Sequence, residues 1–543
     1  MGALTNPKPQ SFRPHGEFEL AESAPSRLGD LMAPLEHLLI SGSDARLAID
    51  ASTRLNVYGC APSPRPAVIS FASTTASSIS SRAFAAAQRA RERLAQASSA
   101  PELFDNALES LRVSLKRQFH IGDPDTEVVL AASGTDAQLC TLFIARACLD
   151  SPLTSIVVAA EETGSGTAFT ALGQHFNSQT ACGSAVMKGA PIEGLADGLA
   201  RIDIRARDGD GLPRHPQDVD QDVIAAVTSA RAQGRGVLLF AMDQSKSGLG
   251  GPSSECLRFI EEEFGANVVI ALDACQGRLT QHALKRHLSR GHLVLMTGSK
   301  FFTGPPFSGA IFVPPGIAQR IGGSCEVPAG LGHYSGRSEW PHAWKQVRAQ
   351  LPRYMNLGLW LRWEAALAEI AAYHRVPETF RSTALARFAA AVPRLLAEFS
   401  FCRLVDPERS MSGSAEDRAA RSIYPFLIQM TGRPLSFAEM KEIYGSLNCD
   451  LSAELKQNRI WPGNGSASTL CHIGQPLLMN DFAKREVGAL RLSADARFIS
   501  DAWQPEDESG SIERVDAKIR DIRTILKKIE IILELKSQRE VVA

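Results

Sequence analysis

The sequence predicts an α/β protein, in which a large domain with a mostly parallel β-sheet precedes a smaller α+β domain. Short, continuous apolar runs alternate with helical segments between about residues 127 and 313, which is typical of a parallel sheet covered by helices on both faces. The length of 543 residues corresponds to more than one domain. Hydrophobic residues make up 44% and charged residues 22%, which excludes wholesale disorder and a polytopic membrane protein.

Changes in composition divide the chain into three parts. Residues 1–50 mix proline, serine and charge with one apolar stretch, Leu31–Ile40, and we expect an N-terminal arm with one helix. Residues 51–375 are the expected large domain. Residues 376–543 are the expected small domain, and its segment Val515–Leu535 has the pattern of a long, charged amphipathic helix.

The expected large domain opens with a helical pattern and continues with six apolar runs. From about residue 85 to 120 the chain is rich in alanine and charge, with Pro101 as its only proline, and we expect helix there. A long helical pattern from Asn356 to about Tyr373 leads out of this domain, and further helices are expected at Ser382–Phe399 and Phe437–Tyr444. The runs that predict strands are Glu127–Ala132, Ser155–Ala160, Gly236–Ala241, Val268–Asp273, Leu293–Thr297 and Gly309–Val313.

Charge, hydropathy and cysteine usage exclude several classes of function. The 58 Lys and Arg residues against 59 Asp and Glu residues give a net charge of −1, so no sequence-wide basic field exists to bind nucleic acid. No apolar run approaches the roughly 18 residues that cross a bilayer, and Met1–Gln10 lacks the apolar core of a signal peptide. Ten cysteines are scattered without metal-ligand spacing, which favours reduced thiols. We therefore expect a cytoplasmic enzyme without a metal site.

Ligands of parallel sheets bind beyond the carboxyl ends of the strands, and two of these turns carry polar groups. Ser133-Gly134-Thr135 follows the first run and opens a helix. Its free backbone N–H groups would make an anion site, or the turn is an ordinary helix N-cap. Asp273 ends another run, followed by Ala274-Cys275-Gln276. A carboxylate there needs a cation, such as a protonated ring nitrogen, or else it caps the next element.

Two basic residues stand in apolar surroundings. Lys300 follows Thr297-Gly298-Ser299 at the end of a run and precedes two phenylalanines. Desolvation there lowers the pKa of a lysine and makes its amine a usable nucleophile, although a lone lysine is usually a surface residue. Arg491 lies inside an apolar run. An arginine there suits either bidentate binding of a carboxylate or a structural ion pair. Together the four signals describe a pyridoxal 5'-phosphate (PLP) site.

In this order and spacing, about residues 50–535 resemble the fold type I PLP-dependent enzymes, specifically the class V aminotransferase group that contains cysteine desulfurases and selenocysteine lyases. The segment 273–276 is similar to the family's Asp-x-x-Gln, and the segment 297–300 to its Ser-Gly-His-Lys. The resemblance implies a seven-stranded sheet, a Schiff base on Lys300, a ring nitrogen paired with Asp273, a ring hydroxyl paired with Gln276, and a homodimer. It also implies cofactor contacts from Gly134, Thr135, Thr163, Ser245, Thr297, Ser299 and Tyr354, and substrate contacts from Arg491 and Asn56.

Several positions depart from the family's pattern. Thr163 stands where the family has a histidine stacked on the ring, so the ring loses an aromatic partner. Ser245 stands where the family usually has an asparagine. Arg353-Tyr354 replaces a Gly-Thr whose threonine reaches the phosphate in the partner subunit. These changes alter the expected surroundings of the cofactor.

The most informative departure concerns a reactive thiol. His472-Ile473-Gly474-Gln475-Pro476-Leu477 resembles the desulfurase loop that carries the catalytic cysteine, and Ile473 stands at the position of that cysteine. The spacing to Arg491, 491 − 473 = 18, is the one that the resemblance implies. Isoleucine forms no thiolate, so cysteine desulfuration is disfavoured. Cys471, two residues earlier, is a displaced alternative, because residues two apart in an extended segment share a side.

The sequence supports three hypotheses for the function. The first is a PLP-dependent enzyme that acts on an amino acid or amine, most simply as an aminotransferase. The alternative within this class is a lyase that eliminates a group from Cβ. A non-catalytic scaffold that binds a partner through the C-terminal helix is the third, opposed by the presence of Lys300, Asp273 and Gln276. An NAD enzyme is excluded because no GxGxxG follows the first run.

Overall fold

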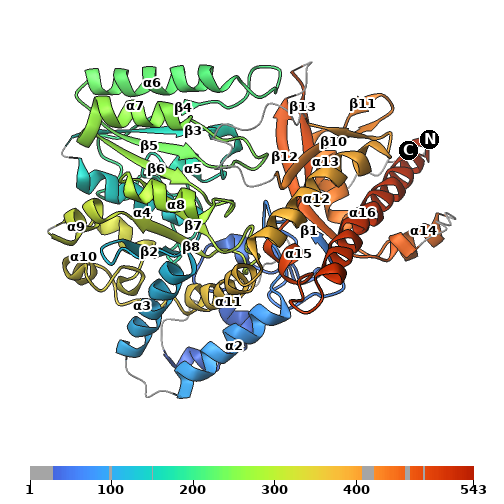
Figure 1. Ribbon diagram of the computed structural model, residues 1–543, viewed down its shortest axis with the longest axis horizontal. Helices are drawn as coiled ribbons and strands as arrows, with labels where there is room; N and C mark the ends of the chain where they lie inside the picture. The colour runs from blue at the N-terminus through green and yellow to red at the C-terminus, as the bar shows by residue number, and fades with distance from the viewer. Residues whose placement is uncertain are drawn as a thin grey trace, which may run out of the picture.

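The computed structural model describes residues 28–96, 101–149, 151–323, 325–405, 421–458, 465–480 and 484–542. Figure 1 shows two sheets side by side, with α11 (Leu357–His374) and α12 (Glu378–Ala397) leading from the first to the second. No helix in these ranges is long and apolar enough to span a membrane.

The first sheet has seven strands in the order β2-β8-β7-β6-β5-β3-β4. All neighbours are parallel except β8, which runs antiparallel to both β2 and β7. The structure thus confirms the mostly parallel, seven-stranded sheet. The strands are β2 (Glu127–Ala131), β3 (Leu153–Val158), β4 (Ala200–Ile204), β5 (Gly236–Met242), β6 (Val268–Asp273), β7 (Leu293–Thr297) and β8 (Gly309–Val313).

Helices cover both faces of this sheet, because alternate strand residues belong to different hydrophobic cores. In β2, Val128 and Leu130 pack in one cluster while Val129 and Ala131 pack in another. The first cluster holds α2 (Ser81–Gln96), α3 (Pro101–Gln118), α6 (Pro216–Ala232), α7 (Ser254–Phe264), α8 (Gln281–Ser289) and α11. The second holds α4 (Gly134–Cys148), α9 (Pro315–Gly323) and α10 (Lys345–Gln350).

The second sheet has six strands in the order β1-β12-β13-β10-β11, with β9 paired to β10. Its first strand, β1, comes from before the large sheet and lies parallel to β12, with Ile69 opposite Cys471. The predicted domain boundaries stay a prediction, but β1 belongs to the small sheet although its residues fall in the range expected for the large domain. The strands are β1 (Ile69–Phe71), β9 (Cys402–Leu404), β10 (Ile423–Met430), β11 (Arg433–Pro434), β12 (Cys471–Asn480) and β13 (Glu486–Ser493).

The small sheet is covered by α12 and α13 (Phe437–Leu447), and α16 (Glu508–Val542), the long helix at the right of Figure 1, packs against both of these helices. The apolar side of α16 is buried, with Ile522, Ile525 and Ile529 in the hydrophobic core. Apart from the buried Lys528, the charged residues of α16 lie mainly on its solvated face, and its buried apolar stripe is not available as a partner surface. The remaining short helices are α5 (Thr167–Thr170), α14 (Ser452–Gln457) and α15 (Ala496–Ser500).

The N-terminal segment is docked onto the large domain through Arg362 of α11. This side chain is fully buried, and its guanidinium donates hydrogen bonds to the backbone carbonyls of Phe307, Leu39, Ser41 and Gly42. The helix expected at Leu31–Ile40 is present as η1 (Leu28–Met32) followed by α1 (Leu35–Leu39). The first 27 residues of the expected arm lie outside the described ranges.

Candidate functional site

Three turns converge at the carboxyl edge of the large sheet: the entry of α4, the end of β6 and the end of β7. A Cβ built on Gly134 would lie 3.1 Å from Cys275 Sγ and 3.3 Å from Thr297 Cγ2, so glycine allows the close approach. Thr297 then donates its hydroxyl hydrogen to the carbonyl of Cys275, at 2.7 Å. Because parallel strands end at one edge, residues 163 positions apart in the sequence (297 − 134) meet here.

The entry of α4 is an N-cap. Ser133 Oγ accepts hydrogen bonds from the backbone N–H groups of Thr135 and Asp136, both at 3.2 Å. The turn is therefore an N-cap, in which the preceding serine satisfies these two N–H groups, and an anion site at this turn stays a prediction. The hydroxyl groups of Thr135 and Ser299 remain without an internal partner in the described chain, so both can donate to an anion.

Asp273 ends β6 and has both carboxylate oxygens engaged. Its Oδ1 accepts from the backbone N–H of Cys275 at 3.0 Å, and its Oδ2 accepts from the side-chain amide of Gln138, on α4, at 3.3 Å. Both partners are neutral, so the carboxylate keeps its charge available for a cation. Beside it, Gln276 is buried and donates to the carbonyl of Thr74 at 3.4 Å, while its Oε1 accepts from Arg278 at 3.0 Å.

Lys300 follows β7 in the turn that begins at Thr297, and its side chain is partly exposed. Among the described residues, its amine has no hydrogen-bond or ion-pair partner. The loop after it is held against the Asp273 turn, because Phe301 N–H donates to the carbonyl of Gln276 at 3.3 Å. The structure thus places an unpartnered amine beside the carboxylate turn.

Arg491, on β13, is buried and surrounded by neutral acceptors. Its guanidinium donates to the carbonyl of Gln475 at 2.6 and 3.0 Å, to Thr75 Oγ1 at 3.1 Å and to the carbonyl of Lys246 at 3.3 Å. No carboxylate lies within 4.0 Å of it in the described ranges, so the structural ion pair is excluded. Burial lowers the pKa of Arg491 to about 10, and the group stays charged at neutral pH.

The segment 73–75 links Arg491 to the large-domain turns. Thr74 accepts from Gln276, and Thr75 accepts from Arg491 and from the backbone N–H of Gln475 at 3.1 Å. Since this segment directly follows β1, the strand that the small sheet takes from the N-terminal side also brings Arg491 to the carboxyl edge of the large sheet.

A second lysine, Lys246, was not among the predicted site residues. Its amine donates to the carbonyl of Thr163, and its own carbonyl accepts from Arg491. Burial, with further contributions from the positive charges of Arg491 and Lys300, lowers its pKa to about 7. Its position in a Gly- and Ser-rich loop gave no periodic signal, so the fold alone reveals it.

Arg46 also belongs to the site's surroundings and was missed, because it lies in the expected arm. Asp44 caps the short helix η2 (Ala45–Leu47) and binds Arg46 through both carboxylate oxygens, at 2.8 and 2.6 Å. The guanidinium lies 4.5 Å from the ring centroid of Phe307 and donates to Ser133 Oγ at 3.5 Å. The arm therefore places the Arg46–Asp44 ion pair next to the N-cap of α4.

Four other predicted contacts are engaged within the chain. The hydroxyl of Thr163 donates to the carbonyl of Ala160 at 2.7 Å, and Ser245 donates to the buried carboxylate of Glu162. Asn56 Oδ1 accepts from the backbone N–H groups of Tyr58 and Cys60, which shapes its own loop. Tyr354 donates to the carbonyl of Ala181 of the same chain at 3.3 Å. Their roles toward cofactor and substrate stay predictions.

Neither Ile473 nor Cys471 is presented at the surface of a loop. Both are fully buried in β12 and belong to the hydrophobic core. Burial raises the pKa of the Cys471 thiol to about 11, and its Sγ lies 3.7 Å from the carbonyl of Thr469. The residue of this strand that faces Arg491 is Gly474, at which a Cβ would lie 2.9 Å from Arg491 Cβ.

Comparisons with known proteins give structural likenesses and no sequence match. No family model and no curated protein matches the chain. Among solved structures, it is similar to a NifS-like protein (TM-score 0.47, 12% identity, 85% of this chain and 99% of that chain). It is also similar to the cysteine desulfurase CsdA from Escherichia coli (TM-score 0.46, 14% identity, 84% and 95%). A third is the cystine C-S lyase C-DES (TM-score 0.46, 12% identity, 83% and 97%). The function is therefore inferred from the site residues alone.

Proposed function

We propose that this protein is a PLP-dependent enzyme that acts on an amino acid. The observation that carries the proposal is the Lys300 amine, which follows a buried strand and has no internal partner in the described chain. An amine in such a position is the group that bonds an aldehyde. Asp273 lies in the neighbouring turn, where its carboxylate suits a protonated ring nitrogen.

The donor set suits the rest of the cofactor. The unpartnered hydroxyls of Thr135 and Ser299 are donors that suit a phosphate, and the guanidinium of Arg46, although paired with Asp44, lies at the N-cap of α4. Thr297 is a weaker candidate than expected, because its hydroxyl hydrogen is already donated to Cys275. Gly134 lets the entry of α4 lie close to Cys275 and Thr297, since a side chain there would crowd both residues.

Each residue then has a defined task. Bound PLP supplies an electron sink for negative charge at the substrate's Cα. Asp273 holds a proton on the pyridine nitrogen, and Arg491 orients the substrate by its carboxylate. Lys300 takes the proton from Cα and returns it. Lys246, with its pKa near neutrality, is positioned as a second proton carrier beside Arg491.

Within this class we propose an aminotransferase first, with elimination from Cβ as the alternative. The purified protein, supplied with PLP and a panel of amino acids, is assayed for 2-oxo acid formation with and without an added 2-oxo acid acceptor. Turnover that requires the acceptor supports the aminotransferase, whereas product without an acceptor supports the lyase. A protein that binds no PLP, or whose turnover survives in Lys300→Ala, contradicts the whole proposal. The homodimer and the cytoplasmic location stay predictions.

A further inference from the structure

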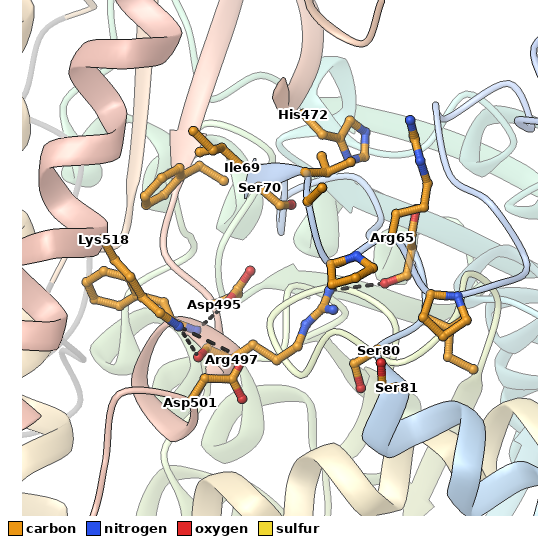
Figure 2. A pocket seen from close by; sticks show the side chains of 18 of the residues that line it. Arg65, Ile69, Ser70, Ser80, Ser81, His472, Asp495, Arg497, Asp501 and Lys518 are labelled. Carbon is orange, nitrogen blue, oxygen red and sulfur yellow. Dashed lines mark hydrogen bonds and ion pairs between the residues drawn. The ribbon is translucent and has the colours of Figure 1, made fainter. Parts of the chain in front are cut away.

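A cavity lies outside the candidate site, between the small sheet and the start of α2. It has a volume of about 600 Å³, within the roughly 300–1,000 Å³ of small-molecule sites. Figure 2 shows its walls, which come from the loop before β1, from β12, from α15 and from α16. None of the predicted cofactor or substrate residues lines it.

Two arginines of this cavity lack a carboxylate partner. Arg65 donates to the side-chain carbonyl of Asn448 at 2.9 Å, and Arg497 donates to the backbone carbonyl of Ser78 at 3.1 Å. No carboxylate lies within 4.0 Å of either guanidinium in the part of the chain that the structure describes. Each one therefore keeps N–H donors and a full charge for another acceptor.

The cavity also contains two further cations, Arg82 and Lys518, and three carboxylates, Asp495, Asp501 and Asp521. Arg82 pairs with Asp501 at 3.0 Å and with the buried Glu369 at 2.6 Å. Lys518 lies 3.9 Å from Asp501. Asp495 caps α15 by accepting from the backbone N–H of Phe498 at 2.7 Å, and burial raises its pKa.

The charges of Arg65 and Arg497 both act on His472, which lines the same cavity. His472 of β12 is held by the carbonyl of Tyr58 at 2.9 Å, and burial together with the charges of Arg65 and Arg497 lowers its pKa to about 4. The cavity thus has a neutral histidine and two arginines whose guanidinium groups have no carboxylate within 4.0 Å in the described ranges. Its apolar wall is formed by Ile69, Phe71, Ile79 and Phe498.

From this arrangement we infer that the cavity binds a small organic anion, in which a carboxylate or a phosphate ester is attached to an apolar body. A guanidinium offers a planar fork of donors that matches either oxyanion. The apolar wall has room for a ring or a short chain beside it. The inference is independent of the proposed function, since no residue of the candidate site takes part.

Calorimetric titration of the full-length protein tests this with phenyl phosphate, phenylacetate and inorganic phosphate as probes. We expect one site per chain for at least one of the two aromatic anions, bound more tightly than inorganic phosphate. The two aromatic probes distinguish a phosphate ester from a carboxylate. Arg497→Gln and Arg65→Gln should each weaken binding about tenfold or more, because each removes a charged hydrogen bond.

Three further variants test whether the anion binds in this cavity and nowhere else. The exposed Arg89→Gln is the matched control and should bind as the parent does. Ala67→Trp fills the exposed rim of the cavity without changing a charge and should abolish binding. Arg491→Gln should leave it unchanged. Binding that survives Ala67→Trp, binding lost only in Arg491→Gln, or no binding of any probe would overturn the inference.

Discussion

At the scale of single residues, the candidate site contains two amines with different surroundings. Lys300 has no internal partner in the described chain, whereas Lys246 is held by the carbonyl of Thr163 and lies against Arg491. Sequence reasoning found Lys300 because it stands in a characteristic turn. It missed Lys246 because nothing local distinguishes a lysine that the fold later buries.

We expect borohydride reduction of the PLP-loaded protein to label Lys300. Its amine is free and follows the strand end next to Asp273, whereas the Lys246 amine already donates to Thr163. Peptide mapping of the reduced protein identifies the labelled residue, and Lys300→Ala serves as the control. A label on Lys246 would show that the two lysines have exchanged roles.

The low pKa of Lys246 predicts a pH-dependent stability. Its folded pKa is about 7, against an ordinary value of 10.5. Between these values the unfolded chain binds more protons than the folded chain, so the free energy of unfolding rises with pH across this window. Lys246→Met should therefore stabilise the protein at pH 6, by on the order of 1 kcal/mol after discounting for partial exposure, and the gain should vanish near pH 10.

Thermal unfolding at pH 6, 8 and 10 measures this difference. Lys285→Met, at an exposed position on α8, is the matched control and should show no such trend. A Lys246→Met variant that is equally destabilised at every pH would mean that only its hydrogen bond to Thr163 matters.

At the scale of elements, apolar patterning predicts most of the large sheet. The six expected strands correspond to β2, β3, β5, β6, β7 and β8 within about two residues. The seventh, β4, was missed because its sequence Ala-Arg-Ile-Asp-Ile alternates polar and apolar residues at the edge of the sheet, where it is only partly buried. Local sequence patterns could not predict the pairing of β1 with β12 either, because this pairing joins segments that are about 400 residues apart in the chain.

The docking of the N-terminal segment onto α11 gives an element-scale prediction. Arg362→Met removes a hydrogen bond from each of four buried or partly buried backbone carbonyls, of which Gly42 keeps its bond from Asn356. Each unsatisfied carbonyl costs about 1–3 kcal/mol, so we expect the free energy of unfolding to fall by roughly 3 kcal/mol or more. Urea unfolding measures the change, with Arg117→Met at an exposed position of α3 as the control.

Arg362→Met should also change the affinity of the protein for PLP. Because the same segment carries Arg46 to the N-cap of α4, weakened docking should reduce PLP affinity more than the control does. An Arg362→Met protein as stable as Arg117→Met would show that the segment contributes little to the fold.

At the scale of the whole molecule, neither Ile473 nor Cys471 offers an accessible thiol at the position that the resemblance to desulfurases implies. Ile473 and Cys471 both point into the core, and burial raises the pKa of Cys471 to about 11. We therefore expect little alanine or sulfide from cysteine in the presence of PLP and reductant. Cys471→Ser should behave as the parent does, and fast alanine formation that disappears in Cys471→Ser would restore the desulfurase.

The parallel pairing of β1 with β12 has a consequence for how the protein is made. The ribosome adds Cys471, the partner of Ile69 in this pairing, 402 residues after Ile69 (471 − 69). The pairing of β1 with β12 therefore cannot form before then. All seven strands of the large sheet leave the exit tunnel in the interval, so this sheet can form while β1 still has an open edge. Arg491, the last predicted site residue to be synthesised, comes 20 residues after Cys471 (491 − 471). A nascent chain therefore contains Lys300 and Asp273 long before it contains Arg491, and the proposed site is complete only after the small sheet has formed.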